Sequence, residues 1–141
     1  KDSGRRWMKT QGHVRRDKML TRALGDTNED AARGKLGACS QAVRSAFLAI
    51  DGALDRAATD LTTRPLRRGG EWYARSYRHD GALVCELHPK GEWIKVKIDK
   101  TAFVRAPRAL LPIGETRTGW LRVAPEGAPT AVRFFEDLIA R

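Results

Sequence analysis

Residues 92–99 decide how this chain folds, and they read Glu92-Trp93-Ile94-Lys95-Val96-Lys97-Ile98-Asp99. Ile94, Val96 and Ile98 alternate with charged or aromatic side chains. A period of two is typical of a β-strand that is buried on one face, because successive side chains point to opposite faces. The sequence therefore predicts a strand here, with an apolar inner face and an outer face that carries an aromatic ring and two lysines.

Three more strands are predicted around this one. Residues 71–78 and 83–88 precede it, residues 119–124 follow it, and the turns at His79-Asp80-Gly81 and Pro89-Lys90-Gly91 separate the first three. Residues 62–70 contain Pro65 and a pair of glycines, so we expect a connector there. Residues 103–117 are expected to be irregular, with Leu110 and Leu111 filling an edge of the core.

Two helices are predicted, one on each side of the strands in the sequence. Order is expected to begin near Asp26, which forms a capping box with Glu29. In residues 38–58 an apolar stripe repeats at helical spacing, and a last helix is expected from Pro129. The stripes consist of Val43, Phe47, Ile50 and Leu54 in the first helix, and of Val132, Phe135, Leu138 and Ile139 in the last. The predicted fold is α+β, a four-stranded antiparallel meander with one N-terminal and one C-terminal helix packed on one face.

The charge of the chain is high and unevenly distributed. The 141 residues carry a formal net charge of +10, and residues 1–18 contain seven cationic and two acidic side chains. A net positive charge favours a polyanionic partner such as nucleic acid. We therefore predict a basic arm or linker over residues 1–25, with Arg15 and Arg16 as candidate phosphate contacts, and a single domain over residues 26–141.

The predicted outer face of the sheet is rich in aromatic rings and cations. Its candidate nucleic-acid-binding residues are Tyr73, Arg75, Tyr77, Trp93, Lys95, Lys97, Trp120 and Arg122, accompanied by Val84, Glu86 and His88. Bases stack on exposed rings while Lys and Arg neutralise phosphates. A solvated sheet face, or one covered by the arm or the long loop, would have the same composition. A third possibility is a protein-interaction or homodimer surface built on the rings.

The remaining motifs indicate no enzyme. The three histidines fall in an arm, a turn and a strand end, and no catalytic constellation, cofactor motif or metal-ligand pattern is recognised. Cys39 and Cys85 stand alone and are predicted to be buried free thiols in a reducing cytoplasm. No apolar run is long enough to span a membrane. Because the chain opens on Lys1, we expect it to be part of a longer protein.

Several short motifs resemble an uncharacterised bacterial domain family labelled "predicted transport protein". The resemblance starts near residue 42 and runs to the C-terminus. The motifs are Leu48-Ala49-Ile50-Asp51, Leu83-Val84-Cys85-Glu86-Leu87, Ile94-Lys95-Val96-Lys97-Ile98, Gly119-Trp120 and Phe135-Glu136-Asp137-Leu138-Ile139. In that family a Gly-His-Trp-Gly-like segment usually precedes the last strand, whereas this chain has no histidine between Gly114 and Trp120.

The resemblance implies a context for the domain. Some members of the family are C-terminal modules of restriction-type proteins that also contain ParB-like and HNH nuclease domains. By analogy the chain would be an accessory module of a bacterial DNA-defence or DNA-processing protein, with DNA in preference to RNA and the other domains of its parent protein as partners.

Overall fold

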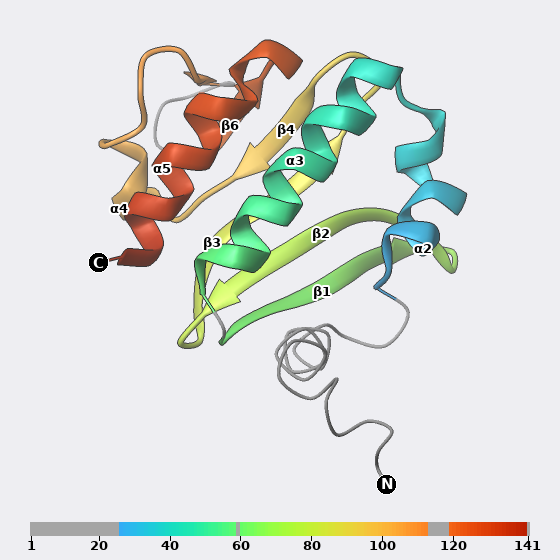
Figure 1. Ribbon diagram of the computed structural model, residues 1–141, viewed down its shortest axis with the longest axis horizontal. Helices are drawn as coiled ribbons and strands as arrows, with labels where there is room; N and C mark the ends of the chain where they lie inside the picture. Colours follow the sequence, from blue (N-terminus) through green and yellow to red (C-terminus); the bar gives the residue numbers. More distant parts are fainter. Residues whose placement is uncertain (1–25, 59, 113–118, 141) are drawn as a thin grey trace, which may run out of the picture.

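A six-stranded antiparallel sheet forms the centre of the fold (Figure 1). The computed structural model describes residues 26–58, 60–112 and 119–140, so the predicted arm lies outside the described residues. The strand order is β1-β2-β3-β4-β6-β5. The strands are Leu61–Arg68 (β1), Glu71–His79 (β2), Ala82–Pro89 (β3), Ile94–Lys97 (β4), Leu111–Pro112 (β5) and Trp120–Val123 (β6). The α+β prediction is confirmed, but the sheet has more than the four strands expected.

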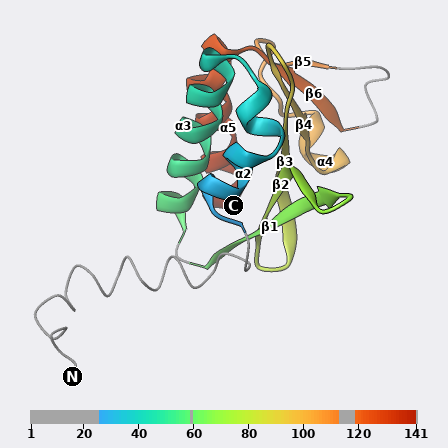
Figure 2. The same ribbon diagram turned by 90° about the vertical axis from the view of Figure 1, so that its right-hand side faces the viewer.

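Helices cover one face of this sheet. The helical segments are Asn28–Arg33 (α2), Lys35–Ala38 (η1), Gln41–Ala57 (α3), Lys100–Phe103 (α4), Pro125–Gly127 (η2) and Ala128–Ala140 (α5). Figure 2 shows α2, α3 and α5 on the same side of the strands, as predicted for the two main helices. The side chain of Ser40 caps α3 by accepting a hydrogen bond from the backbone of Val43.

The capping box of α2 is shifted by one residue from its predicted place. Thr27 is the N-cap and Asp30 is its partner, in place of Asp26 and Glu29. The Asp30 carboxylate accepts hydrogen bonds from the side chain and backbone of Thr27, and these bonds lower its pKa to about 2. Asp26 is thereby left to turn inward, where it is fully buried.

The predicted connector over residues 62–70 was wrong, because most of it is the edge strand β1. Leu61 and Thr63 are buried while the alternate residues Thr62 and Arg64 are exposed, which is the pattern of a half-buried strand. Pro65 lacks a backbone N–H, but an edge strand needs its N–H groups on one side only. Gly69 and Gly70, both with positive φ, then turn the chain into β2.

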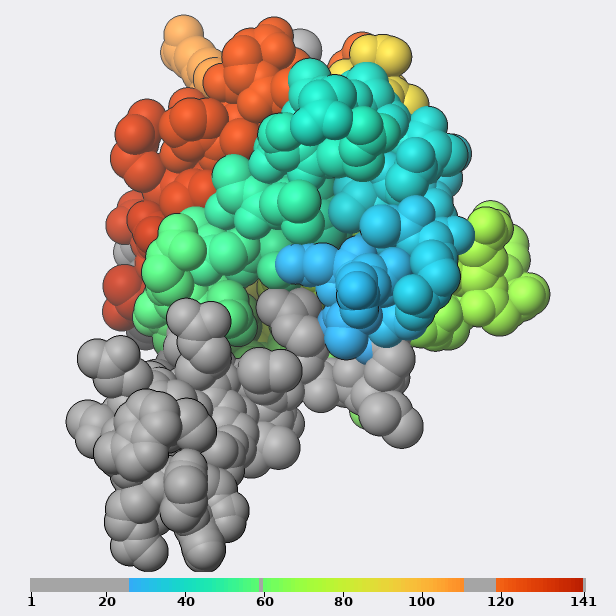
Figure 3. All heavy atoms as spheres, turned by 45° about the vertical axis from the view of Figure 1, so that its right-hand side comes forward, coloured from blue at the N-terminus to red at the C-terminus, as the bar shows by residue number. Residues whose placement is uncertain are grey.

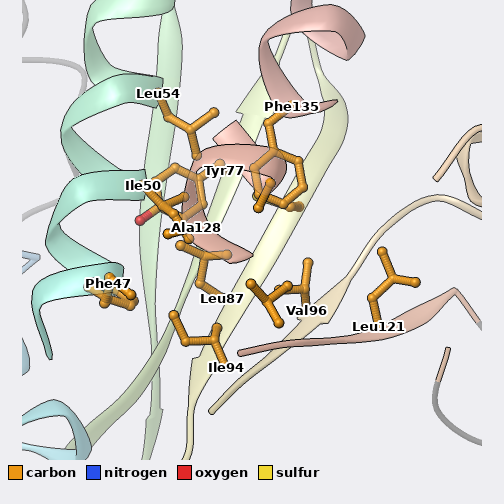
Figure 4. Close-up of a cluster of buried hydrophobic side chains, with 14 of the residues drawn as sticks. Phe47, Ile50, Leu54, Tyr77, Leu87, Ile94, Val96, Leu121, Ala128 and Phe135 are labelled. Carbon is orange, nitrogen blue, oxygen red and sulfur yellow. The ribbon is translucent and has the colours of Figure 1, made fainter. Parts of the chain in front are cut away.

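The core lies between the inner face of the sheet and helices α3 and α5 (Figure 4). Phe47 and Ile50 of α3 and Phe135 of α5 are fully buried against Leu87 and Val96 of the strands. Burying one such side chain contributes about 1.5–3 kcal/mol. Leu110 is also buried, which confirms its predicted place in the core, and both cysteines are buried free thiols.

Candidate functional site

The outer face of the sheet, opposite the helices, brings together residues from five strands. Residues that are direct partners in neighbouring strands share a face, so the register defines rows across the sheet. One row runs through Arg64, Ser76, Glu86, Lys97 and Trp120. A second row runs through His88, Lys95 and Arg122. We call the surface formed by Arg64, Arg68, Tyr73, Glu86, His88, Trp93, Lys95, Lys97, Trp120 and Arg122 the basic aromatic face.

Three rings form a continuous line over this face. The centroid of the Tyr73 ring lies 5.9 Å from that of His88, and His88 lies 5.2 Å from Trp120 in an edge-to-face arrangement. His88 belongs to β3 and Trp120 to β6, so their rings meet above β4, which lies between those strands. Aromatic pairs of this geometry stabilise each other by about 0.5–1.5 kcal/mol. The rings therefore hold one another in position.

Cationic side chains lie over the rings at the two ends of this line, and another lies over Trp93 beside it. Arg68 lies 4.8 Å from the centroid of Tyr73, and Arg122 lies 4.6 Å from that of Trp93. The ammonium groups of Lys95 and Lys97 lie 4.4 and 5.6 Å from Trp120. A cation over a ring face is attracted to the ring quadrupole. The cationic groups are thus positioned by the rings rather than spread freely in solvent.

Glu86 is engaged within the basic aromatic face. Its carboxylate lies 3.0 Å from Nε2 of His88. Burial lowers the pKa of His88, as do the charges of Lys90 and Lys95, while Glu86 acts in the opposite direction. His88 is therefore neutral at pH 7, and the positive charge of the face comes from its arginines and lysines.

Two of the predicted binding residues, Arg75 and Tyr77, are not on this surface. Both are fully buried on the inner face. Trp72 pairs with Arg67 and Ala74 pairs with Leu66, so Tyr73 is an extra residue in β2 and forms a β-bulge. A bulge shifts the alternation of the strand by one residue. Tyr73 remains outside, but the residues after it point opposite to the prediction.

A second irregularity affects β3. Cys85 pairs with Tyr77 and Leu83 with Arg78, which leaves Val84 as the extra residue. Val84 is buried, whereas the sequence predicted it on the outer face. Six of the predicted binding residues do lie on the outer face, as part of the basic aromatic face: Tyr73, Trp93, Lys95, Lys97, Trp120 and Arg122. Arg15 and Arg16 lie outside the described residues.

The inward-facing Arg75 is the centre of a buried polar network. Its five N–H donors are directed at five acceptors. The acceptors are the Asp26 carboxylate at 2.7 Å, the Asn28 side chain at 2.9 Å, the Asp51 carboxylate at 3.1 Å, and the backbone carbonyls of Asp26 and Thr27 at 3.2 and 3.1 Å. The network fixes the chain before α2 to the sheet.

Tyr77 completes this network from the same strand. Its hydroxyl donates a hydrogen bond of 2.8 Å to the Asp51 carboxylate. Burial, together with the charge of Asp51, raises the pKa of Tyr77 well above its usual range. Sequence reasoning missed the network, although one signal was present. Asp51 follows Phe47 by four residues and Ile50 by one, so an acidic residue sits in the apolar stripe of α3 and needs a buried partner.

No protein-family model, curated protein or solved structure matches this chain. The support for its function therefore comes from its own residues, and the resemblance to a bacterial domain family stays a prediction. In the described ranges no helix has the length and apolar composition needed to cross a membrane.

One group of side chains has the composition of a metal site. Ligand atoms of Asp60, His79 and Asp80 lie within 4.8 Å of one another at one end of the sheet. Nε2 of His79 is already 3.0 Å from the Asp60 carboxylate, and both aspartates are exposed. The contact between His79 and Asp60, at the end of the β1–β2 ladder, explains the proximity of these groups without a metal ion.

Proposed function

We propose that this domain binds nucleic acid through the basic aromatic face. The observation that carries the proposal is that Arg68, Lys95, Lys97 and Arg122 are each held over an aromatic ring on one face of the sheet. Positioned cations neutralise phosphates with little loss of side-chain entropy, and release of counterions from the nucleic acid then favours binding.

The same contacts indicate how binding would take place. Because cations lie over Tyr73, Trp93 and Trp120, an approaching strand meets Lys and Arg first, and a base stacks only where a cation moves aside to a phosphate. Phosphate contacts carry no sequence information. The domain would therefore bind nucleic acid with low sequence specificity.

The cellular context belongs to the same proposal. We propose that the domain works in the cytoplasm of a bacterium. Its two buried free thiols agree with a reducing compartment, and the bacterial source is implied by the resemblance alone. We propose DNA as the ligand in preference to RNA, because the family that the chain resembles includes modules of restriction-type proteins. An accessory role beside other domains of a parent protein follows from the same analogy.

Charge reversal on the basic aromatic face tests this function. We expect Lys95→Glu and Arg122→Glu each to weaken binding of a fluorescent single-stranded oligonucleotide about tenfold at 100 mM salt, because each replaces a phosphate contact by repulsion. Arg56→Glu, on the exposed side of α3, is the matched control and should change affinity much less. Fluorescence anisotropy measures all three variants.

The salt dependence gives a second measurement on the same samples. With four phosphate contacts, the logarithm of the association constant should fall with that of salt concentration with a slope of about −3. Lys95→Glu should make this slope shallower by about 1. If the two outer-face reversals weaken binding no more than Arg56→Glu does, the basic aromatic face is not the interface. Binding by Arg15→Gln and Arg16→Gln variants, measured in parallel, shows whether the arm contributes to the affinity.

The protein-interaction or homodimer alternative has less support. Among the described residues the exposed large hydrophobic side chains are Leu48 and Val104, and neither belongs to the basic aromatic face. An interface core is depleted in charge, whereas the rings of this face are covered by cations. Sedimentation at several protein concentrations tests self-association directly.

A further inference from the structure

A small basic pocket adjoins the basic aromatic face at the end where Arg68 and Tyr73 meet. Its volume is about 270 Å³. The pocket is lined by Lys35, Arg68, Glu71, Tyr73, Pro89 and Lys90. These residues come from η1, from the β1–β2 hairpin, and from the end of β3 with the turn that follows it. Figure 3 shows the hairpin (green) projecting beside the segment that contains α2 and η1 (blue).

Close backbone contacts hold the first wall of the pocket. A Cβ atom at Gly34 would lie 2.3 Å from the carbonyl oxygen of Trp72, which is shorter than any real contact. Glycine is therefore needed for the chain before η1 to lie against β2. Lys35 follows directly and is placed at the pocket by this contact.

The other two cations are also fixed by their elements. The backbone N–H of Lys90 donates to the carbonyl of Trp93 at 2.7 Å, and the N–H of Ser40 donates to the carbonyl of Gly91 at 2.9 Å. The turn that carries Lys90 is thus tied to the start of α3. Arg68 is held over the Tyr73 ring at 4.8 Å. Three separate segments converge to place three cations around one cavity.

The charge of the pocket is not balanced by its own residues. Three cations face a single carboxylate, that of Glu71. Burial lowers the pKa of Lys90, and the positive charges of Lys95, Lys35 and Arg68 lower it further. Like charges that are held together in this way repel each other, and an anion in the cavity would relieve the repulsion.

We propose that this pocket binds the phosphomonoester group at the end of a nucleic-acid strand that lies on the basic aromatic face, an inference that rests on the proposed function. The formal excess of two positive charges around the cavity matches a phosphomonoester, which carries about −1.5 to −2 at pH 7. An internal phosphodiester carries only one negative charge. Lys and Arg supply several donors for the three terminal oxygens. Tyr73 belongs to both surfaces, so a strand on the face leads into the pocket.

Oligonucleotides of one sequence with different ends test the inference. The strands carry a 5′-phosphate, a 3′-phosphate or hydroxyl groups only, and the full chain is titrated with each. We expect one phosphorylated strand to bind about five- to tenfold more tightly than the hydroxyl strand. Lys35→Gln and Lys90→Gln should bring this ratio close to one. Lys100→Gln removes a lysine that does not line the pocket and should leave the ratio unchanged.

The outcomes separate this inference from the proposed function. If the hydroxyl strand binds and neither phosphate improves its affinity, the pocket inference is overturned while the proposed function stands. If no strand binds, the proposed function fails. Titration of the labelled protein with inorganic phosphate and adenosine monophosphate, followed by NMR, then decides about the pocket. Saturable shifts at Lys35, Tyr73 and Lys90 that are lost in Lys90→Gln would retain it as a phosphate site, and their absence would reject it.

Discussion

Replacing Arg75 by alanine should destabilise this domain by about 3–5 kcal/mol, because it leaves buried charges without their partner. The carboxylates of Asp26 and Asp51 are both buried and both accept hydrogen bonds from Arg75. A natural domain has a total stability of about 5–15 kcal/mol, so a large part of it depends on one guanidinium. Urea unfolding followed by circular dichroism measures the loss.

Two further variants show whether the geometry or only the charge of Arg75 stabilises the domain. Arg78→Ala lies three residues along the same strand, where the side chain is exposed and donates to the carbonyl of Gly81. We expect it to cost less than about 1 kcal/mol. Arg75→Lys keeps the charge but cannot reach five acceptors, so it should still be clearly destabilising. If Arg75→Ala costs no more than Arg78→Ala, the network does not hold the fold together.

The parts of the fold with strong periodicity could be predicted from the sequence. The stripe of α3 and the alternation around Ile94, Val96 and Ile98 are long enough to define both the element and its buried face. Strand β1 could not be predicted in the same way. Pro65 and the glycine pair are typical of a connector, and only the position of β1 at the sheet edge makes a proline acceptable there.

The candidate site was predictable only as far as the strand registers were. In β4 and β6 the alternation is unbroken, and Lys95, Lys97, Trp120 and Arg122 lie on the outer face as expected. In β2 one inserted residue moved the side chains that follow it to the opposite face of the sheet from the one predicted. A bulge has no reliable sequence signature, because it depends on how two strands pair rather than on either strand alone.

The bulge at Tyr73 links the buried network to the outer surface. Without the extra residue, a regular strand would place Trp72 and Arg75 on opposite faces. With it, Trp72 packs edge-to-face on Phe47 while Arg75, also on the inner face, reaches Asp26 and Asp51. Tyr73 between them points outward to Arg68 and His88. One irregularity thus supplies both the anchor of the fold and an end of the candidate binding surface.

Alkaline pH should destabilise the domain strongly, because two buried groups resist losing their protons. Burial raises the pKa of Cys85 and of Tyr77 well above their usual ranges, and the nearby carboxylates, Glu86 for Cys85 and Asp51 for both, act in the same direction. The unfolded chain loses these protons near pH 8.5 and 10, whereas the folded chain keeps them. The folded state then binds more protons than the unfolded state, so the free energy of unfolding falls as pH rises.

The size of this effect depends on how far apart the folded and unfolded pKa values of each group lie. Each group lowers the free energy of unfolding by about 1.4 kcal/mol for every pH unit between its unfolded and its folded pKa. Urea unfolding between pH 7 and 11, with a reductant present, measures the profile. Other titrating groups, including Cys39 and the lysines, are common to the wild type and its variants, so differences between their curves isolate Cys85 and Tyr77.

The difference in the free energy of unfolding between each variant and the wild type should therefore shrink, in a different pH range for each variant. Tyr77→Phe removes a buried hydrogen bond to Asp51 and should cost about 1 kcal/mol at pH 7, a difference that shrinks only above pH 10. Cys85→Ala opens a small cavity in the core, and its deficit should shrink from about pH 8.5 upward. Curves that stay parallel to the wild type up to pH 11 would show that neither group is held protonated by the fold. If instead the Tyr77→Phe curve converges on that of the wild type and Arg75→Ala is strongly destabilised, Asp51 interacts with two protonated donors in one buried network. One donor is the cationic Arg75 and the other is the neutral Tyr77.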